Sequence, residues 1–273
     1  MSRTNRYLIA VPFALLLAAC LPVLWDLVID WNTDANYSHG FLVPVVSAVL
    51  LWRKRHELRS LPMSTDRRGL VVVALSAAMF IVGNGAAEYF TVRVSFVLTL
   101  FGLTWYLFGP DIIKRAWFAF FFLLFMIPIP YVIYYALTFP MQTFASKVTV
   151  QVLGAIGMGA VRQGNMIHIA GHSLEVAEAC SGIRSLVSLL ALGALFAYAT
   201  QKRFAAQGIL FLSTIPIAVI GNVFRVFVTS LLVYTVSEAV AEEPLHSLMG
   251  LSVFAVAFVM LGIESAILRR IFK

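Results

Sequence analysis

The residues of this sequence best suited to chemistry are a cysteine, an arginine and a histidine from three separate segments. Cys180 lies in Glu178-Ala-Cys-Ser-Gly-Ile-Arg-Ser185, directly before a predicted helix that Ser181 would cap, with Arg184 one turn inside it. The positive end of the helix dipole, the nearby guanidinium and access to water would each favour the thiolate form of Cys180. An inert thiol at a helix start explains the local sequence equally well.

The second candidate, Arg225, lies inside a long apolar segment, Ile220-Gly-Asn-Val-Phe-Arg-Val-Phe-Val-Thr229. A charge there costs about 2.5–3.5 kcal/mol on insertion scales, so it needs a function or a route to the lipid headgroups. At 1.5 Å per residue from Gly208, Arg225 lies roughly 25 Å along the helix, near the outer interface. Asn222, one turn earlier, makes this face polar, which favours a functional role over a snorkelling side chain.

The third candidate, His246, precedes the last apolar segment. A single histidine at a helix start usually has no special role. The three segments, however, place Cys180, Arg225 and His246 at one membrane depth on the outer side. Together they supply a nucleophile, a cation for a developing oxyanion and a proton-transferring base, as thiol acyl transfer requires. His39, at the start of an earlier apolar segment, could face the same site.

The composition indicates that membrane-spanning helices must position these residues. The 273 residues are 61% apolar and 12% charged, whereas soluble domains contain about 45–50% and about 25%. The apolar residues come in blocks of roughly 18–25, the length that a helix needs to cross hydrocarbon. We therefore predict an all-α polytopic membrane protein, a single integral membrane domain over 1–273 with about eight transmembrane helices. The predicted spans are near 7–29, 39–52, 69–87, 92–109, 116–137, 182–200, 208–235 and 250–268.

The net charge of +7 could suggest a nucleic-acid partner, but its distribution argues for a different use. Fifteen of the twenty Lys and Arg residues lie at the N-terminus, the C-terminus and in every second gap between apolar blocks. This is the pattern of the positive-inside rule. It predicts that both termini are cytoplasmic, that the candidate residues face outward, and that the lipid bilayer rather than nucleic acid is the partner of these charges.

The stretch between the fifth and sixth predicted spans is the longest outside the membrane. Its first half, Thr138 to Gly157, is apolar with scattered polar residues, and we expect it to lie along the interface or to re-enter the membrane. Its second half, Val161 to Val176, alternates around Gly164-Asn165 and Gly171-His172. That alternation predicts a small extracytoplasmic β-hairpin, which would deliver the chain to Cys180.

The other cysteine, Cys20, belongs to Leu17-Ala-Ala-Cys20, which matches the cleavage box of bacterial lipoproteins. The residues that follow remain apolar, whereas a lipoprotein would turn polar there. We therefore predict that Cys20 is a small buried hydrophobe in the first helix. With one cysteine in an apolar segment and the other outside, a disulfide framework is not expected.

Other polar residues carry weaker signals. His168 and His172 have the spacing of metal ligands, but no acidic or cysteine ligand nearby completes a set, so neither a metal nor a cofactor is predicted. Glu88, at the outer end of the third span, is expected to pair with Arg93.

The motifs around these residues resemble the exosortase/archaeosortase family of polytopic membrane enzymes. The most specific part of the resemblance is a Cys-Ser-Gly-x-Arg motif followed by an intramembrane arginine and then a histidine. In chain order, the similar segments are Tyr37–Pro44, Met126–Pro130, Ala179–Ser185, Asn222–Arg225 and His246.

The resemblance implies a cysteine protease or transpeptidase that processes exported, tail-anchored proteins. Their C-terminal signal, called PEP-CTERM, consists of a Pro-Glu-Pro motif, a transmembrane helix and a basic tail. The resemblance implies that Cys180 is the nucleophile, Arg225 the transition-state stabiliser and His246 the acid/base, with Arg184, Ser181, Asn222 and His39 in support. It also implies the inner membrane of a Gram-negative bacterium, an active site facing the periplasm and an association with exopolysaccharide production. The acceptor nucleophile (water, lipid or glycan) stays open.

Two other classes of protein would use the same residues differently. In a transporter or a flippase of lipid-linked glycans, Arg225 would bind an anionic substrate. No internal repeat and no matched pair of interrupted helices supports that class. In a non-catalytic scaffold for exopolysaccharide export, no residue would react. Both alternatives should tolerate Cys180→Ser, whereas a thiol enzyme should not.

Overall fold

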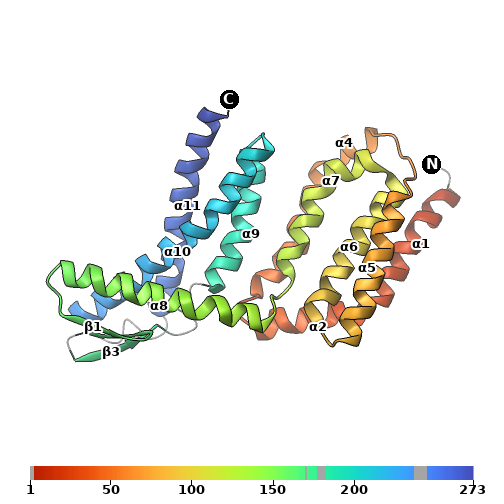
Figure 1. Cartoon of the computed structure of the whole chain (residues 1–273). Helices are drawn as coiled ribbons and strands as arrows, with labels where there is room; N and C mark the ends of the chain where they lie inside the picture. Colours follow the sequence, from red (N-terminus) through yellow and green to blue (C-terminus); the bar gives the residue numbers. More distant parts are fainter. Residues whose placement is uncertain (1–2, 170, 177–182, 237–244, 273) are drawn as a thin grey trace. The chain divides into compact units, whose positions relative to one another are not determined.

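The computed structural model describes residues 3–169, 171–176, 183–236 and 245–272. The chain forms two compact units, residues 1–129 and 130–273 (Figure 1). Each unit is a bundle of helices, and the second also carries a small sheet. The single domain expected over 1–273 stays a prediction.

The first unit begins with two helices where the sequence predicts one span over 7–29. Helix α1 (Arg3–Ala19) and helix α2 (Leu21–Thr33) meet at a 60° bend. Pro22 lies in the first turn of α2, and since proline has no N–H it cannot continue the hydrogen bonds of α1. Cys20 lies at the bend and is buried, 5% exposed. The prediction that it is a small buried hydrophobe is confirmed, although it lies between two helices and not inside one.

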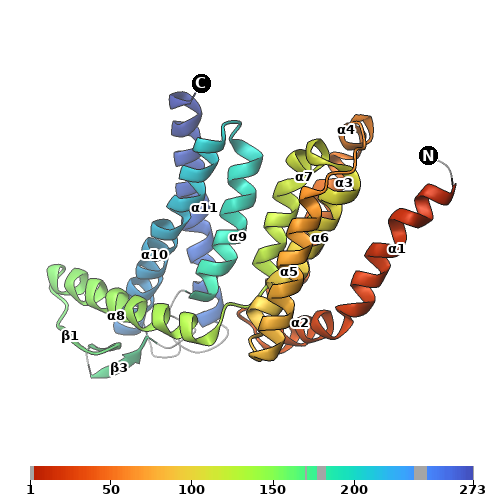
Figure 2. The same ribbon diagram turned by 45° about the vertical axis from the view of Figure 1, so that its right-hand side comes forward.

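The remaining elements of the first unit follow in chain order. They are η1 (Ser38–Phe41), α3 (Leu42–Arg53), α4 (Arg55–Ser60), α5 (Arg68–Gly85), α6 (Tyr89–Phe108), α7 (Pro110–Leu123) and η2 (Leu124–Met126). Helices α5 and α6 form a hairpin and lie side by side in both views (Figures 1 and 2).

The turn between α5 and α6 is closed by Glu88, the N-cap residue of α6. Its carboxylate accepts hydrogen bonds from the backbone N–H groups of Phe90, at 3.2 Å, and Thr91, at 2.6 Å. A hydrogen bond from the Thr91 side chain and these backbone bonds hold the pKa of Glu88 below its usual value. Arg93 forms its ion pair with Asp30 of α2 and not with Glu88 as expected, although the charge of Arg93 also makes a small contribution to the lowered pKa of Glu88.

The helix predicted over 116–137 is interrupted. Helix α7 ends at Leu123, and the next helix, α8 (Tyr131–Ala155), begins only after Ile127-Pro-Ile-Pro130. Each proline removes a backbone donor and disfavours helical geometry in the residue before it. The segment from Thr138 to Gly157, which we expected at the interface or re-entering, lies mostly within the continuous helix α8.

The second unit packs three long helices against one another. They are α9 (Ile183–Thr200), α10 (Phe204–Thr235) and α11 (Leu245–Ile271), and α8 packs on α10. Leu189, Leu210, Val253 and Leu261 are fully buried in the core between the three helices. The sheet lies at the end of this bundle opposite the C-terminus (Figure 2).

The sheet has three antiparallel strands where the sequence predicts a single hairpin. Strands β1 (Ala160–Gln163), β2 (Met166–Ile169) and β3 (His172–Glu175) are ordered β1-β2-β3. Gly164 and Gly171 occupy the turns with φ of 64° and 82°, in the left-handed region that favours glycine. Both turns were visible in the sequence, and each of them closes its own hairpin.

The polytopic helical fold is confirmed. In the described part of the chain, four helices are long and apolar enough to span a membrane, and two bent pairs would raise that number to six. Two more apolar helices, 38–53 and 186–200, have fewer than 18 described residues. These eight segments correspond to the eight predicted spans, although only some reach full spanning length as straight helices.

Candidate active site

Arg225 lies on the buried face of α10. Its side chain is 6% exposed, and the same face carries Asn222 at 1% and Thr229 at 6%. Positions 222, 225 and 229 are one helical turn apart, so they follow one stripe of the helix. Arg225 is 21 residues from the start of α10 at Phe204, or about 32 Å at 1.5 Å per residue, roughly the depth of a hydrocarbon core. The burial of Arg225 within the protein fits a partnered charge better than one that reaches out to headgroups.

Helices α10 and α11 cross closely beside Arg225. A Cβ atom placed on Gly221 would lie 3.0 Å from Cγ1 of Val253 and 3.4 Å from its carbonyl oxygen. One turn further along α10, Arg225 Nη1 lies 4.0 Å from the position of a Cβ on Gly250. Gly221 thus allows α10 to approach α11, and the guanidinium of Arg225 lies at ordinary van der Waals distance from a Cβ position on Gly250.

The crossing places Arg225 next to the first turns of α11. His246 is the second residue of α11 and precedes Gly250 by four residues. Residues four apart lie on the same helix face, about 6 Å apart along the axis. The structure therefore brings the backbone position of His246 within one turn of the contact between Arg225 and α11. The role of the imidazole stays a prediction.

Cys180 and Ser181 lie outside the described residues. The nearest described residues before and after them are Val176 and Ile183. Val176 packs with Val226, the neighbour of Arg225 on α10. Arg184 is the second residue of α9. The last described residue before Cys180 thus belongs to the same buried cluster as a residue of α10.

Sequence reasoning missed a polar face on α8, the helix that packs on α10. Gln142, Ser146 and Thr149 are all buried, at 6%, 0% and 0% exposed. Ser146 Oγ bonds to the carbonyl oxygens of Thr143 and Gly164, which ties α8 to the turn between β1 and β2. The signal was the spacing of polar residues at intervals of three and four in an otherwise apolar segment.

His39 lies in the first unit, where it holds two motifs together. Its Nε2 is 3.2 Å from the carbonyl oxygen of Phe125, and Trp31 Nε1 donates to the carbonyl oxygen of Met126 at 2.8 Å. A Cβ on Gly40 would collide with the Trp31 indole. These bonds join the segment 37–44 to the segment 126–130, a contact that separate motifs do not reveal. The supporting role of His39 in catalysis stays a prediction.

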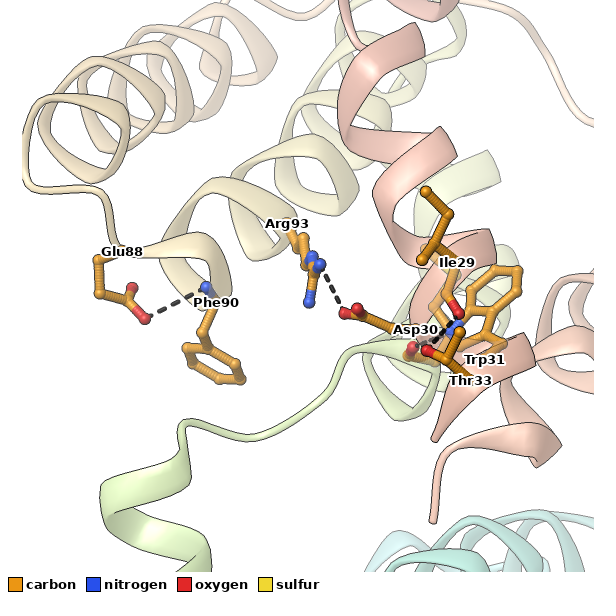
Figure 3. A network of polar contacts seen from close by, with 8 residues as sticks. Ile29, Asp30, Trp31, Thr33, Glu88, Phe90 and Arg93 are labelled. Atoms are coloured by element: carbon orange, nitrogen blue, oxygen red, sulfur yellow. Dashed lines mark hydrogen bonds and ion pairs between the residues drawn. The ribbon is translucent and has the colours of Figure 1, made fainter. Parts of the chain in front are cut away.

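An ion pair with a buried arginine lies beside this cluster. Arg93 Nη2 of α6 is 2.7 Å from Asp30 Oδ2 of α2, with the arginine side chain 8% and the aspartate 37% exposed (Figure 3). Removing Asp30 would leave the buried guanidinium of Arg93 without this partner, which is costly. The pair therefore fixes α2 against α6 within the first unit.

His168 and His172, which have the spacing of metal ligands, lie in different surroundings within the sheet. His168 Nδ1 and Ser173 Oγ are 2.8 Å apart across the β2–β3 pair, and His172 lies opposite Ile169. Among the described residues, no three His, Cys, Asp or Glu side chains group closely enough to hold a metal ion.

The close approach at Gly221 supports a prediction about stability. Gly221→Ala should lower the melting temperature of the purified protein, because crowding Val253 costs about 1–3 kcal/mol and exceeds the helix-propensity gain of about 1 kcal/mol. Gly208→Ala on the same helix is the matched control, since a Cβ there meets nothing within 4 Å. It should leave the melting temperature unchanged or raise it. Equal melting temperatures for the two variants would contradict the helix crossing described here.

The fold and the site define a polytopic membrane protein with an arginine buried on one of its long apolar helices. The chain matches the family described as transmembrane exosortase (Exosortase_EpsH) over residues 31–263, and it belongs to that family. It is therefore a membrane-embedded sorting enzyme of the cysteine protease or transpeptidase class. Among curated proteins and among solved structures, nothing matches the chain significantly.

Proposed function

We propose that the protein cleaves the C-terminal PEP-CTERM-type signal of exported proteins through Cys180, Arg225 and His246. The thiolate of Cys180 attacks the scissile carbonyl, Arg225 stabilises the oxyanion, and His246 protonates the departing amine. The acyl group then passes to an acceptor. Ser181 and Arg184 support the thiolate, and Asn222 continues the polar stripe of Arg225.

The observation that carries this proposal is the burial of Arg225 against the first turns of α11. Its Nη1 lies beside Gly250, one turn from His246. A cation held inside the protein costs free energy that a purely structural helix contact would not require. The same residue adjoins Val226, which packs on Val176 just before the cysteine-bearing segment. These two contacts of α10, with α11 at Gly250 and with the strand end at Val176, support the proposal that the cysteine and the histidine act beside Arg225.

The proposed substrates carry their own transmembrane helix. Such a substrate diffuses in two dimensions and presents its cleavage site at a fixed height, which supplies much of the proximity that catalysis needs. A basic tail orients that helix by the positive-inside rule. We place the enzyme in the bacterial inner membrane with both termini cytoplasmic and the site facing the periplasm.

Co-expression with a tagged substrate tests the function. A reporter ending in a Pro-Glu-Pro motif, a transmembrane helix and a basic tail should be shortened to a tail-less product, measured by immunoblot and intact mass. A matched reporter with the Pro-Glu-Pro motif scrambled should stay full length. Shortening of both reporters would indicate non-specific proteolysis, and shortening of neither would overturn the proposed substrate class.

The orientation can be tested separately by labelling single cysteines in intact cells. Single-cysteine variants at positions 172, 180 and 243 should react with a membrane-impermeant maleimide added from outside. A cysteine placed at Arg59 in the same cysteine-free background should react only after the cells are opened. The opposite result, with the Arg59 position labelled in intact cells and positions 172, 180 and 243 labelled only after the cells are opened, would show that the topology is inverted. The site would then lie on the wrong side for exported substrates.

The transporter and scaffold alternatives give different outcomes. A flippase would use the positive charge of Arg225 on an anionic substrate, and a scaffold would need no reactive group. Either protein should support exopolysaccharide export with Cys180→Ser in place of the wild type. Loss of reporter processing in that variant supports the enzyme.

A further inference from the structure

The first unit contains a cavity that the proposed reaction does not use. It has a volume of about 430 Å³ and lies between four helices, with Phe13 from α1, Leu51 from α3, Leu100 from α6 and Phe120 from α7 among its lining residues. Its size falls in the range of small-molecule sites, about 300–1,000 Å³. Its wall is almost entirely apolar, so its occupant must present hydrocarbon.

One end of the cavity carries two positive charges. Arg55 and Arg59 of α4 line it and are four residues apart, so they point from the same side of that helix. Arg59 is exposed and Arg55 half-buried, so this end meets the protein surface. Arg55 is already oriented: its Nη1 donates to the Trp52 carbonyl oxygen at 3.1 Å, and its Cζ lies 4.6 Å from the Trp52 ring centroid.

These two charges have no carboxylate partner within the described residues. The acidic residue of α4, Glu57, is bound instead to Arg115 Nη1 at 2.7 Å. The sequence from 53 to 68 contains six basic and two acidic residues, so the surroundings also favour an anion. A guanidinium provides several donors that match phosphate geometry.

We propose that this cavity binds one anionic phospholipid, with an acyl chain between α1, α3, α6 and α7 and the phosphate between Arg55 and Arg59. A transmembrane helix of a substrate does not fit, because a cylinder about 10–12 Å wide would fill the volume within about one turn. A soluble phosphate compound would leave the apolar wall uncovered. An anionic phospholipid has both a charged headgroup for the arginines and an acyl chain for the apolar wall.

Native mass spectrometry of the purified full-length protein can test the site. Dioleoyl phosphatidylglycerol should bind about 30-fold more tightly than dioleoyl phosphatidylcholine, since two arginines at about 1 kcal/mol each give that ratio. Arg55→Gln with Arg59→Gln should reduce phosphatidylglycerol binding to the phosphatidylcholine level. Arg67→Gln with Arg68→Gln removes the same charge nearby but outside the cavity lining, and it should retain the preference.

Several outcomes would overturn the proposal. Equal affinity for the two lipids would show that the cavity does not select a net negative headgroup, and the anionic-lipid assignment would be wrong. An equal loss in the two double variants would mean that diffuse charge attracts the lipid. Tight binding of glycerol 3-phosphate alone would identify a soluble-phosphate site. Thr104→Trp, which fills the cavity from α6, should also abolish tight binding, and the melting temperature of each variant shows that it is folded. None of these readouts requires catalytic activity.

Discussion

Replacing Cys180 with alanine is expected to abolish processing of the tagged substrate. In the proposed reaction the thiolate forms a C–S bond with the scissile carbonyl as the C–N bond breaks, and no other cysteine in the chain lies outside an apolar segment. Loss of a catalytic nucleophile costs on the order of 10⁶ in rate in a well-studied protease, which here means no product in a cell-based assay. Adding hydroxylamine to active enzyme with substrate should release a substrate hydroxamate from the thioester, and Cys180→Ala should release none.

Cys20→Ala is the matched control, because Cys20 is buried at the bend between α1 and α2. That variant should process substrate and yield hydroxamate like the wild type. His246→Ala should slow formation of the adduct while leaving Cys180 alkylatable, since imidazole has an ordinary pKa of about 6.5 and suits proton donation near neutral pH. Full processing by Cys180→Ala would end the nucleophile assignment. Processing by the wild type without a trappable adduct would argue for direct attack by water.

Arg225→Lys is expected to lower the processing rate by about 10²–10³, the usual cost of losing one oxyanion donor. Lysine keeps the positive charge but replaces the planar group of five donors with a compact ammonium on a flexible chain. The loss should fall on kcat with little change in KM, because the oxyanion exists only in the transition state. Initial rates on purified enzyme and a synthetic tail peptide in lipid nanodiscs would measure both constants.

Arg162→Lys provides the comparison, since Arg162 is an exposed arginine of β1 whose Nη1 bonds only to the nearby Gly164 carbonyl oxygen among the contacts described. It should keep the wild-type rate. A near wild-type rate in Arg225→Lys would show that charge alone suffices there, as in an anchor for an anionic group. A change in KM alone would point to ground-state substrate binding.

Helix positions were predictable where the sequence is continuously apolar. The helix predicted over 208–235 corresponds to α10, and that over 250–268 lies within α11, because long uninterrupted apolar blocks leave few alternatives. The helices predicted over 7–29 and 116–137 are interrupted, at Pro22 and at Pro128 with Pro130. In each case hydropathy stays high across the proline, so a search for apolar blocks does not register the loss of backbone donors.

The candidate site was predictable in its residue types but not in its contacts. The sequence could identify Arg225 because a charge in an apolar helix is conspicuous. It could not show that the guanidinium lies beside Gly250, since this depends on the register between α10 and α11. For the same reason Arg93 was assigned the local partner Glu88 when its partner is Asp30, more than 60 residues away. Contacts between distant segments leave no trace in a single sequence.

The length of α10 has a consequence for how the enzyme tolerates different membranes. Its 32 residues extend about 48 Å, against a hydrocarbon core of about 30 Å, so the helix is mismatched by several turns. If Arg203 anchors the start of α10 at one surface, Arg225 lies about 33 Å further along, at the opposite edge of the core. Cores of about 27–32 Å require a tilt of no more than about 35° to keep it there. A change in the tilt of α10 then compensates for a change in bilayer thickness, so that the guanidinium stays at the boundary between hydrocarbon and water.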